Sequence, residues 1–144
     1  MRVVLDTNIL VRAFVSSDGL AYDLVQTLLA SDHVLVVSNE MLAELTRVLR
    51  YSRLQAEHCE DEEAVYDFAG LIRHTGELVP LNILTVAPIR DPADVIVLQT
   101  AICGEAKILC TMDRDFYAPP ASIFLAEQGI TVLTDAQLIR ALRH

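Results

Sequence analysis

The segment Val3-Val4-Leu5-Asp6-Thr7-Asn8 sets the fold of this chain, because a short apolar run ends abruptly there in a carboxylate followed by two more polar side chains. Such a run is typical of a buried strand, and Asp6 marks its carboxyl end. Asp6 is also a suitable N-cap for the helix that follows, so this aspartate alone does not indicate a site. Thr7 and Asn8 offer further acceptors where one cap would suffice, which favours a role beyond capping.

Two later segments repeat this pattern. The run 34–37 leads through Ser38 into a helix with Glu40 and Glu44, and the run 107–111 leads to Asp113 and Asp115. We expect strands over 2–6, 34–37, 107–111 and 131–133, and helices over 20–31, 39–50, 60–74, 93–103, 122–128 and 135–143. This alternation predicts an α/β fold with a parallel sheet, in which the acids gather at the carboxyl edge.

Composition limits the function classes. With 144 residues, of which 53% are hydrophobic, the chain is the size of a single domain, which we expect to span residues 1–144. A net charge of -9 argues against unaided, non-specific binding of nucleic acid, which depends on basic surfaces. A phosphate-bearing substrate would therefore require a metal ion or a local basic strip.

The cysteines and the apolar segments indicate the compartment. Cys59, Cys103 and Cys110 are odd in number and lack the spacing of a zinc site, so we expect reduced thiols. No apolar run approaches the roughly 20 residues of a membrane span, and the first residues lack the layout of a secretory signal. We expect a cytoplasmic protein without membrane contact.

Helical geometry separates the two acids of helix 39–50. Its apolar stripe is formed by Met41, Leu42, Leu45, Val48 and Leu49. Glu44 falls at the edge of this stripe, whereas Glu40 lies nearer the opposite face, where a solvated role in the first turn is sufficient. Glu44 is the better site candidate.

The remaining acids divide in a similar way. Asp91 precedes a proline and fits an N-cap, whereas Asp94 belongs to a helix that is apolar on nearly every side and needs a cation or donors. Asp113 lies nearer the strand end than Asp115 and would approach Asp6 if their strands are neighbours. Asp115 is expected to have a supporting or capping role.

Several carboxylates that converge without compensation repel one another, so a positive group should lie among them. No Cys/His pair has zinc spacing, and an oxygen-only ligand set selects Mg²⁺ or Mn²⁺. Such ions activate water for phosphodiester hydrolysis. Nearby cations could contact backbone phosphates, although exposed arginines are more often simply solvated. These candidate RNA contacts are Arg12, Arg47, Arg50 and Arg114.

Four motifs occur in an order that resembles the PIN-domain nucleases, especially the VapC-like bacterial toxins. These motifs are residues 3–8, residues 38–45, Asp91-Pro92-Ala93-Asp94 and Thr111-Met112-Asp113. The resemblance implies a three-layer α/β/α sandwich and a ribonuclease dependent on Mg²⁺ or Mn²⁺. It implies an acidic cluster of Asp6, Glu44, Asp94 and Asp113, supported by Asn8 and Thr111. It also implies homodimers and a small antitoxin that occludes the site.

The chain departs from the family pattern at one position. Many relatives carry an additional polar or acidic residue after the acid that matches Asp94, whereas this chain has Val95. Whether the site holds one ion or two is therefore open, and Asp91 or Asp115 could supply the additional ligand.

Other functions remain to be weighed against the nuclease. An Asp-nucleophile phosphatase needs a second acid at the position of Asn8, and a receiver domain needs paired acids where Asp6 stands alone. The non-enzymatic alternative is a PIN-like scaffold that binds RNA or a protein partner without cutting it. Retention of all four acids favours the enzyme.

Overall fold

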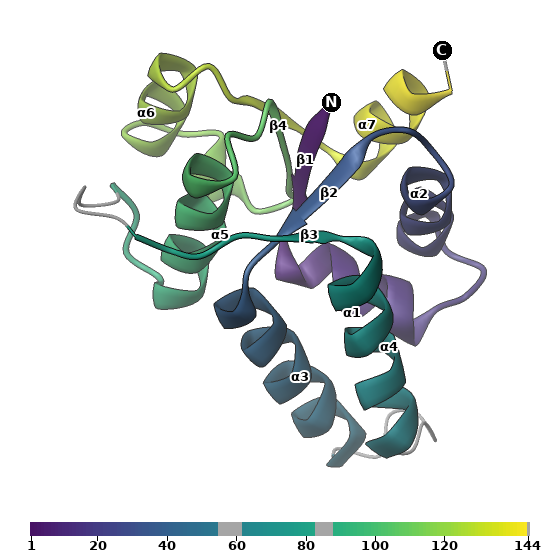
Figure 1. Ribbon diagram of the computed structural model, residues 1–144. Coiled ribbons are helices and arrows are strands. Elements are labelled where there is room, and N and C mark those ends of the chain that lie inside the picture. Colours follow the sequence, from purple (N-terminus) through teal and green to yellow (C-terminus); the bar gives the residue numbers. More distant parts are fainter. Residues whose placement is uncertain (55–61, 83–87, 144) are drawn as a thin grey trace.

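The computed structural model describes residues 1–54, 62–82 and 88–143, which form a parallel sheet with helices on both faces (Figure 1). The strands are β1 Arg2–Leu5, β2 Val34–Val37, β3 Glu77–Leu78, β4 Ile108–Cys110 and β5 Thr131–Leu133. Their order is β3-β2-β1-β4-β5, and every neighbouring pair is parallel. The carboxyl ends of all these strands therefore meet at one edge, with β1 in the middle.

Alternation along the buried strands produces two cores. Val3 and Leu5 point to one face and join α1 Thr7–Val15, α2 Leu20–Leu29, α4 Glu62–Thr75 and α7 Asp135–Leu142. Val4 points to the other face, which is covered by α5 Pro92–Cys103, the 3₁₀ helix η1 Arg114–Phe116 and α6 Ala121–Glu127. Because both faces are covered, the central strands are apolar throughout rather than alternating. The predicted three-layer α/β/α sandwich is confirmed.

The helix α3 Asn39–Leu54 follows β2 and contributes to both cores, with Leu45 on one side and Met41 on the other. In Figure 1, α3 and α4 lie side by side and extend beyond the carboxyl end of β2. Phe14 of α1 and Phe68 of α4 pack with their ring centroids 5.3 Å apart. Both α3 and α4 therefore contact α1, the helix that Asp6 caps.

Four predicted strands are found within a residue of their expected bounds, but three features differ from the sequence expectation. α1 is not among the expected helix ranges, although Asp6 is a suitable N-cap for a helix at this point. β3 was not predicted, because its two residues are exposed and form no apolar run. α3 continues to Leu54 rather than ending at residue 50, since no glycine or proline follows to interrupt it. The expected start of the next helix at residue 60, and Cys59, lie outside the described residues.

None of the helices in the described ranges has both the length and the apolar character needed to cross a membrane. Cys110 is a fully buried free thiol, whereas Cys103 is partly exposed. Burial, followed by the nearby Asp135 and Asp6 carboxylates, raises the pKa of the Cys110 thiol to about 12. This thiol therefore remains protonated at neutral pH.

Candidate active site

Asp6 lies at the point where the middle strand of the sheet ends. Its backbone N–H donates to the Cys110 carbonyl at 2.9 Å, which continues the β1–β4 ladder by one residue. Its side chain caps α1 by accepting from the Asn8 backbone N–H at 3.5 Å. Only 4% of Asp6 is exposed, so its carboxylate is held in place at the base of the carboxyl edge.

Thr111 connects Asp6 to the segment after β4. Its hydroxyl donates to Asp6 Oδ2 at 2.6 Å. The hydroxyl oxygen, Thr111 Oγ1, also accepts a hydrogen bond from the Asp113 backbone N–H at 3.0 Å. Tyr117 supports this segment by donating its hydroxyl to the Thr111 carbonyl at 2.8 Å. One fully buried hydroxyl thus orients the carboxylate of Asp6 and the backbone that carries Asp113.

Three further carboxylates converge beside this network. Ligand oxygens of Asp94, Asp113 and Asp115 lie within 4.8 Å of one another. Asp94 is 8% exposed and comes from the first turn of α5, whose N-cap is Asp91. Asp113 caps η1 by accepting from the Asp115 backbone N–H at 2.9 Å. The capping role predicted for Asp91 is confirmed, whereas the turn after β4 is capped by Asp113 and not by Asp115.

The electrostatics of the cluster show uncompensated negative charge. Burial raises the pKa of Asp94 to about 7, and Asp113, Asp6 and Asp91 add to the effect. Burial also raises the pKa of Asp6, against the hydrogen bond from Thr111. Within the described part of the chain, Asp6, Asp94, Asp113 and Asp115 form no salt bridge. An all-oxygen group of this kind can hold a hard divalent cation.

Glu44 is half-buried on α3, but in this structure its carboxylate is bound by Arg47 rather than by the aspartate cluster. Arg47 Nη2 lies 2.7 Å from Glu44 Oε1, and Arg47 Nε lies 3.1 Å from Oε2. The group of acids close enough to share a cation includes Asp115 and not Glu44 among the described residues. Glu44 would have to leave Arg47 before it could join Asp94 and Asp113.

The other arginines singled out from the sequence lie in different surroundings. Arg50 pairs with Glu62 at 3.1 Å, and Arg12 pairs with the buried Asp135 at 3.0 Å. Arg114 is exposed beside Asp113, and Asn8 is exposed at the start of α1. Arg12 therefore serves at least one structural purpose, which the sequence did not indicate.

Asp135 is a buried carboxylate near the site that sequence reasoning did not single out. It is 4% exposed and follows β5, so the last strand also ends in an acid. The signal was present in Leu133-Thr134-Asp135, which repeats the pattern of Leu5-Asp6. The capping box formed by Thr134 and Gln137 accounts for Thr134 but not for the buried aspartate after it.

The comparisons with known proteins agree with this geometry. A family model for the PIN domain matches residues 2–115, a range that contains Asp6, Glu44, Asp94, Asp113 and Asp115. The chain belongs to the PIN domain family. The resemblance inferred from the sequence motifs is thereby confirmed. No curated protein sequence matches this PIN domain.

Among solved structures, the PIN domain is similar to a chain in the crystal structure of VapBC2 from Rickettsia felis, which is bound to a DNA fragment from their promoter. The TM-score is 0.63 at 17% sequence identity, with 93% of this chain and 98% of that chain covered. At this identity the similarity establishes a shared fold, and it extends over the whole arrangement of sheet and helices.

Proposed function

We propose that this PIN domain is a metal-dependent ribonuclease that hydrolyses RNA phosphodiester bonds and acts as the toxin of a toxin–antitoxin pair. The observation that carries the proposal is the convergence of Asp94, Asp113 and Asp115 within 4.8 Å, next to the buried Asp6. The family match and the VapBC2 neighbour support it. The catalytic carboxylates are Asp6, Glu44, Asp94 and Asp113. Asp115 supplies the additional ligand that many relatives carry at the position of Val95.

The donor set fits Mg²⁺ or Mn²⁺. All of the candidate ligands are carboxylate oxygens, and within the described ranges no cationic side chain pairs with Asp6, Asp94, Asp113 or Asp115. The raised pKa values of Asp94 and Asp6 follow from this crowding and from burial. A divalent cation would compensate the charge that the folded chain leaves unpaired. One ion suits Asp94, Asp113 and Asp115. Asp6, whose carboxylate interacts electrostatically with Asp94 and Asp113, would act beside this ion.

A bound divalent cation would supply a polarised phosphodiester and a water of lowered pKa. The residues provide the positioning. Thr111 and the Asn8 backbone N–H fix the Asp6 carboxylate, and η1 fixes Asp113 relative to Asp115. Asp94, with a pKa of about 7, gives up its proton near neutral pH when positive charge is placed beside it. No covalent step on a protein nucleophile is needed.

The antitoxin is expected to carry a basic segment. The chain has a net charge of -9, and its carboxylate cluster is accessible through the exposed Asp115. A positively charged side chain placed among Asp94, Asp113 and Asp115 would neutralise them as a metal ion would, and would exclude both metal and substrate. The homodimer implied by the resemblance, and the cytoplasmic location expected from the cysteines, belong to the same proposal.

The experiment is an RNA cleavage assay on purified protein with Mg²⁺, with Mn²⁺ and with EDTA, for the parent chain and for Asp6→Asn. Asp67→Asn, which changes an exposed aspartate of α4, is the matched control. Cleavage should require metal and should survive Asp67→Asn but not Asp6→Asn. Cleavage that persists in EDTA and in Asp6→Asn would contradict the proposal, as would an inactive but folded protein with either metal. Growth arrest on expression, relieved by a basic partner protein, tests the toxin role.

A further inference from the structure

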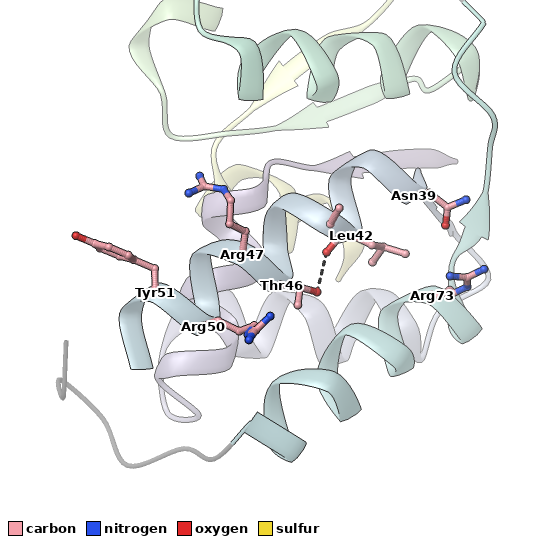
Figure 2. A pocket seen from close by; sticks show the side chains of 8 residues that line it. Asn39, Leu42, Thr46, Arg47, Arg50, Tyr51 and Arg73 are labelled. Carbon is pink, nitrogen blue, oxygen red and sulfur yellow. Dashed lines mark hydrogen bonds between the residues drawn. The ribbon is translucent and has the colours of Figure 1, made fainter. Parts of the chain in front are cut away.

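A groove with a volume of about 670 Å³ lies between α3 and α4, separate from the aspartate cluster. Its charged lining consists of Arg47 and Arg50 from α3 and Arg73 from α4 (Figure 2). The apolar part of its wall includes Leu42, whose carbonyl accepts the Thr46 hydroxyl at 2.9 Å. Among the described residues, no carboxylate lines the groove, although the whole chain has 20 acidic and only 11 basic residues. Positive charge is therefore concentrated here against the overall balance.

The arginines retain donors for a ligand. Among the described residues, Arg47 uses two of its five N–H groups, both on Glu44, which leaves three for a ligand. Arg50 forms an ion pair with Glu62, in which both side chains are about half exposed. Arg73 forms no ion pair within the parts of the chain that the structure describes. The groove thus presents guanidinium N–H donors that remain available to a ligand.

Polar and aromatic groups flank these cations. In Figure 2, Asn39 and Arg73 lie at one end of the groove, whereas Arg47 and Tyr51 lie toward the other. Tyr51 is 61% exposed, so its ring is accessible to a ligand in the groove. Arginines combined with an exposed ring are the elements that bind single-stranded nucleic acid, through phosphate contacts and base stacking.

We propose that this groove binds the backbone of single-stranded RNA, with Arg50 and Arg73 on phosphates and Tyr51 stacked on a base. The inference rests on the proposed ribonuclease function and assigns a substrate track to it. Arg47 joins the two regions, since it lines the groove and binds Glu44, the acid expected to act with Asp6. An acidic peptide would use the arginines but would leave the exposed Tyr51 without a stacking partner, so RNA fits the lining better.

The test measures RNA binding in the Asp6→Asn background, which separates affinity from cleavage. The probe is a fluorescein-labelled single-stranded RNA of about 12 nucleotides, long enough to span a groove of this type. The variants are Arg73→Ser, Arg73→Lys and Tyr51→Ala, and Arg140→Ser is the matched control, since Arg140 is an exposed arginine of α7 outside the groove. Circular dichroism and thermal melting establish that each variant is folded.

Arg73→Ser should weaken binding several-fold and lower the slope of log K against log salt by about 0.7, the value for one phosphate contact on a single strand. Arg73→Lys should restore part of the affinity, and Tyr51→Ala should weaken binding with the salt slope unchanged. Arg140→Ser should match the parent. Equal affinities for Arg73→Ser and Arg140→Ser would overturn the groove proposal, as would a groove-dependent affinity for a labelled poly-glutamate peptide that exceeds the affinity for RNA.

The two proposals fail in different ways. If the parent chain cleaves RNA with metal but the groove variants bind like the control, the ribonuclease stands and the groove proposal falls. If the parent chain cleaves nothing but groove variants lose RNA affinity, the groove proposal stands and the ribonuclease proposal falls in favour of an RNA-binding scaffold.

Discussion

The Thr111 hydroxyl donates to the Asp6 carboxylate at 2.6 Å, across two neighbouring strands and 105 residues of sequence. Both side chains are buried, and Thr111 Oγ1 also accepts from the backbone of Asp113. A single side chain therefore sets the position of two acids that the sequence places in separate motifs. We regard Thr111 as a positioning residue, because it contacts the candidate ligands rather than a substrate.

Thr111→Val should damage the site through this relationship. The variant keeps the side-chain shape but leaves Asp6 Oδ2 and the Asp113 N–H without their partner. We expect stability to fall by about 1–3 kcal/mol and Mn²⁺ affinity to fall about tenfold or more. Both quantities are measurable by denaturant unfolding and by calorimetric titration. Thr111→Ser, which keeps the hydroxyl, should restore metal affinity. If Thr111→Ser and Thr111→Val bind Mn²⁺ equally well, the positioning role is wrong.

The raised pKa of Asp94 should make the stability of the metal-free protein depend on pH between about 4 and 7. This pKa rises from the ordinary 3.8 in the unfolded chain to about 7 in the metal-free fold, mainly by burial. The folded state therefore holds this proton longer, and its contribution to stability is full below pH 3.8 and is lost as pH rises to 7. Asp94→Asn should raise the melting temperature at pH 8 without metal, with the gain disappearing near pH 4.

Mn²⁺ should reverse the order of these two proteins, because it favours the ionised Asp94 of the parent chain and finds one ligand fewer in Asp94→Asn. Asp67→Asn, at an exposed position, should follow the parent chain throughout. If the metal-free Asp94→Asn protein is less stable than the parent at pH 8, the prediction is wrong. The negative charge of Asp94 would then be stabilised by a partner other than its contacts in this structure.

Asp115 offers a direct test of the ligand set. Its carboxylate lies within 4.8 Å of those of Asp94 and Asp113, and it is exposed, so its removal costs little packing. Asp115→Asn should leave the melting temperature without metal nearly unchanged but reduce the stabilisation that millimolar Mn²⁺ provides. Thermal shift measured against Asp67→Asn checks this. An undiminished shift would mean that Asp94 and Asp113 hold the ion with other ligands.

Much of this arrangement was predictable because the strands are short, fully buried and terminated by polar residues. Periodicity located β1, β2, β4 and β5, and their shared parallel direction follows from the alternation with helices. The capping of α5 by Asp91 was also predictable, because N-cap preferences depend on local backbone geometry alone. The placement of Asp6 near Asp113 followed from their strands being neighbours.

What escaped prediction depends on contacts between distant residues. The Glu44–Arg47 pair competes with the site for Glu44, and periodicity cannot tell which partner an acid selects. The sequence offered both Asp91 and Asp115 as the additional ligand, and only the turn of η1, three residues without a sequence period, brings Asp115 toward Asp113. Arg73 reaches the α3 groove only through the packing of α4 against α3. Each of these depends on tertiary geometry.

Arg12 and Asp135 form an ion pair in which the carboxylate is buried, with side-chain exposures of 48% and 6%. Arg12→Ala would leave that carboxylate with the Ala136 backbone N–H as its donor. We expect a loss of about 2 kcal/mol, since a buried charge loses its partner. Arg143→Ala is the matched control, because Arg143 and Asp23 are both about half exposed and such a pair contributes at most about 1 kcal/mol. Asp135→Asn combined with Arg12→Ala should recover part of the loss, as measured by urea unfolding. Equal effects of the two arginine substitutions would show that the burial of Asp135 does not govern its energetics.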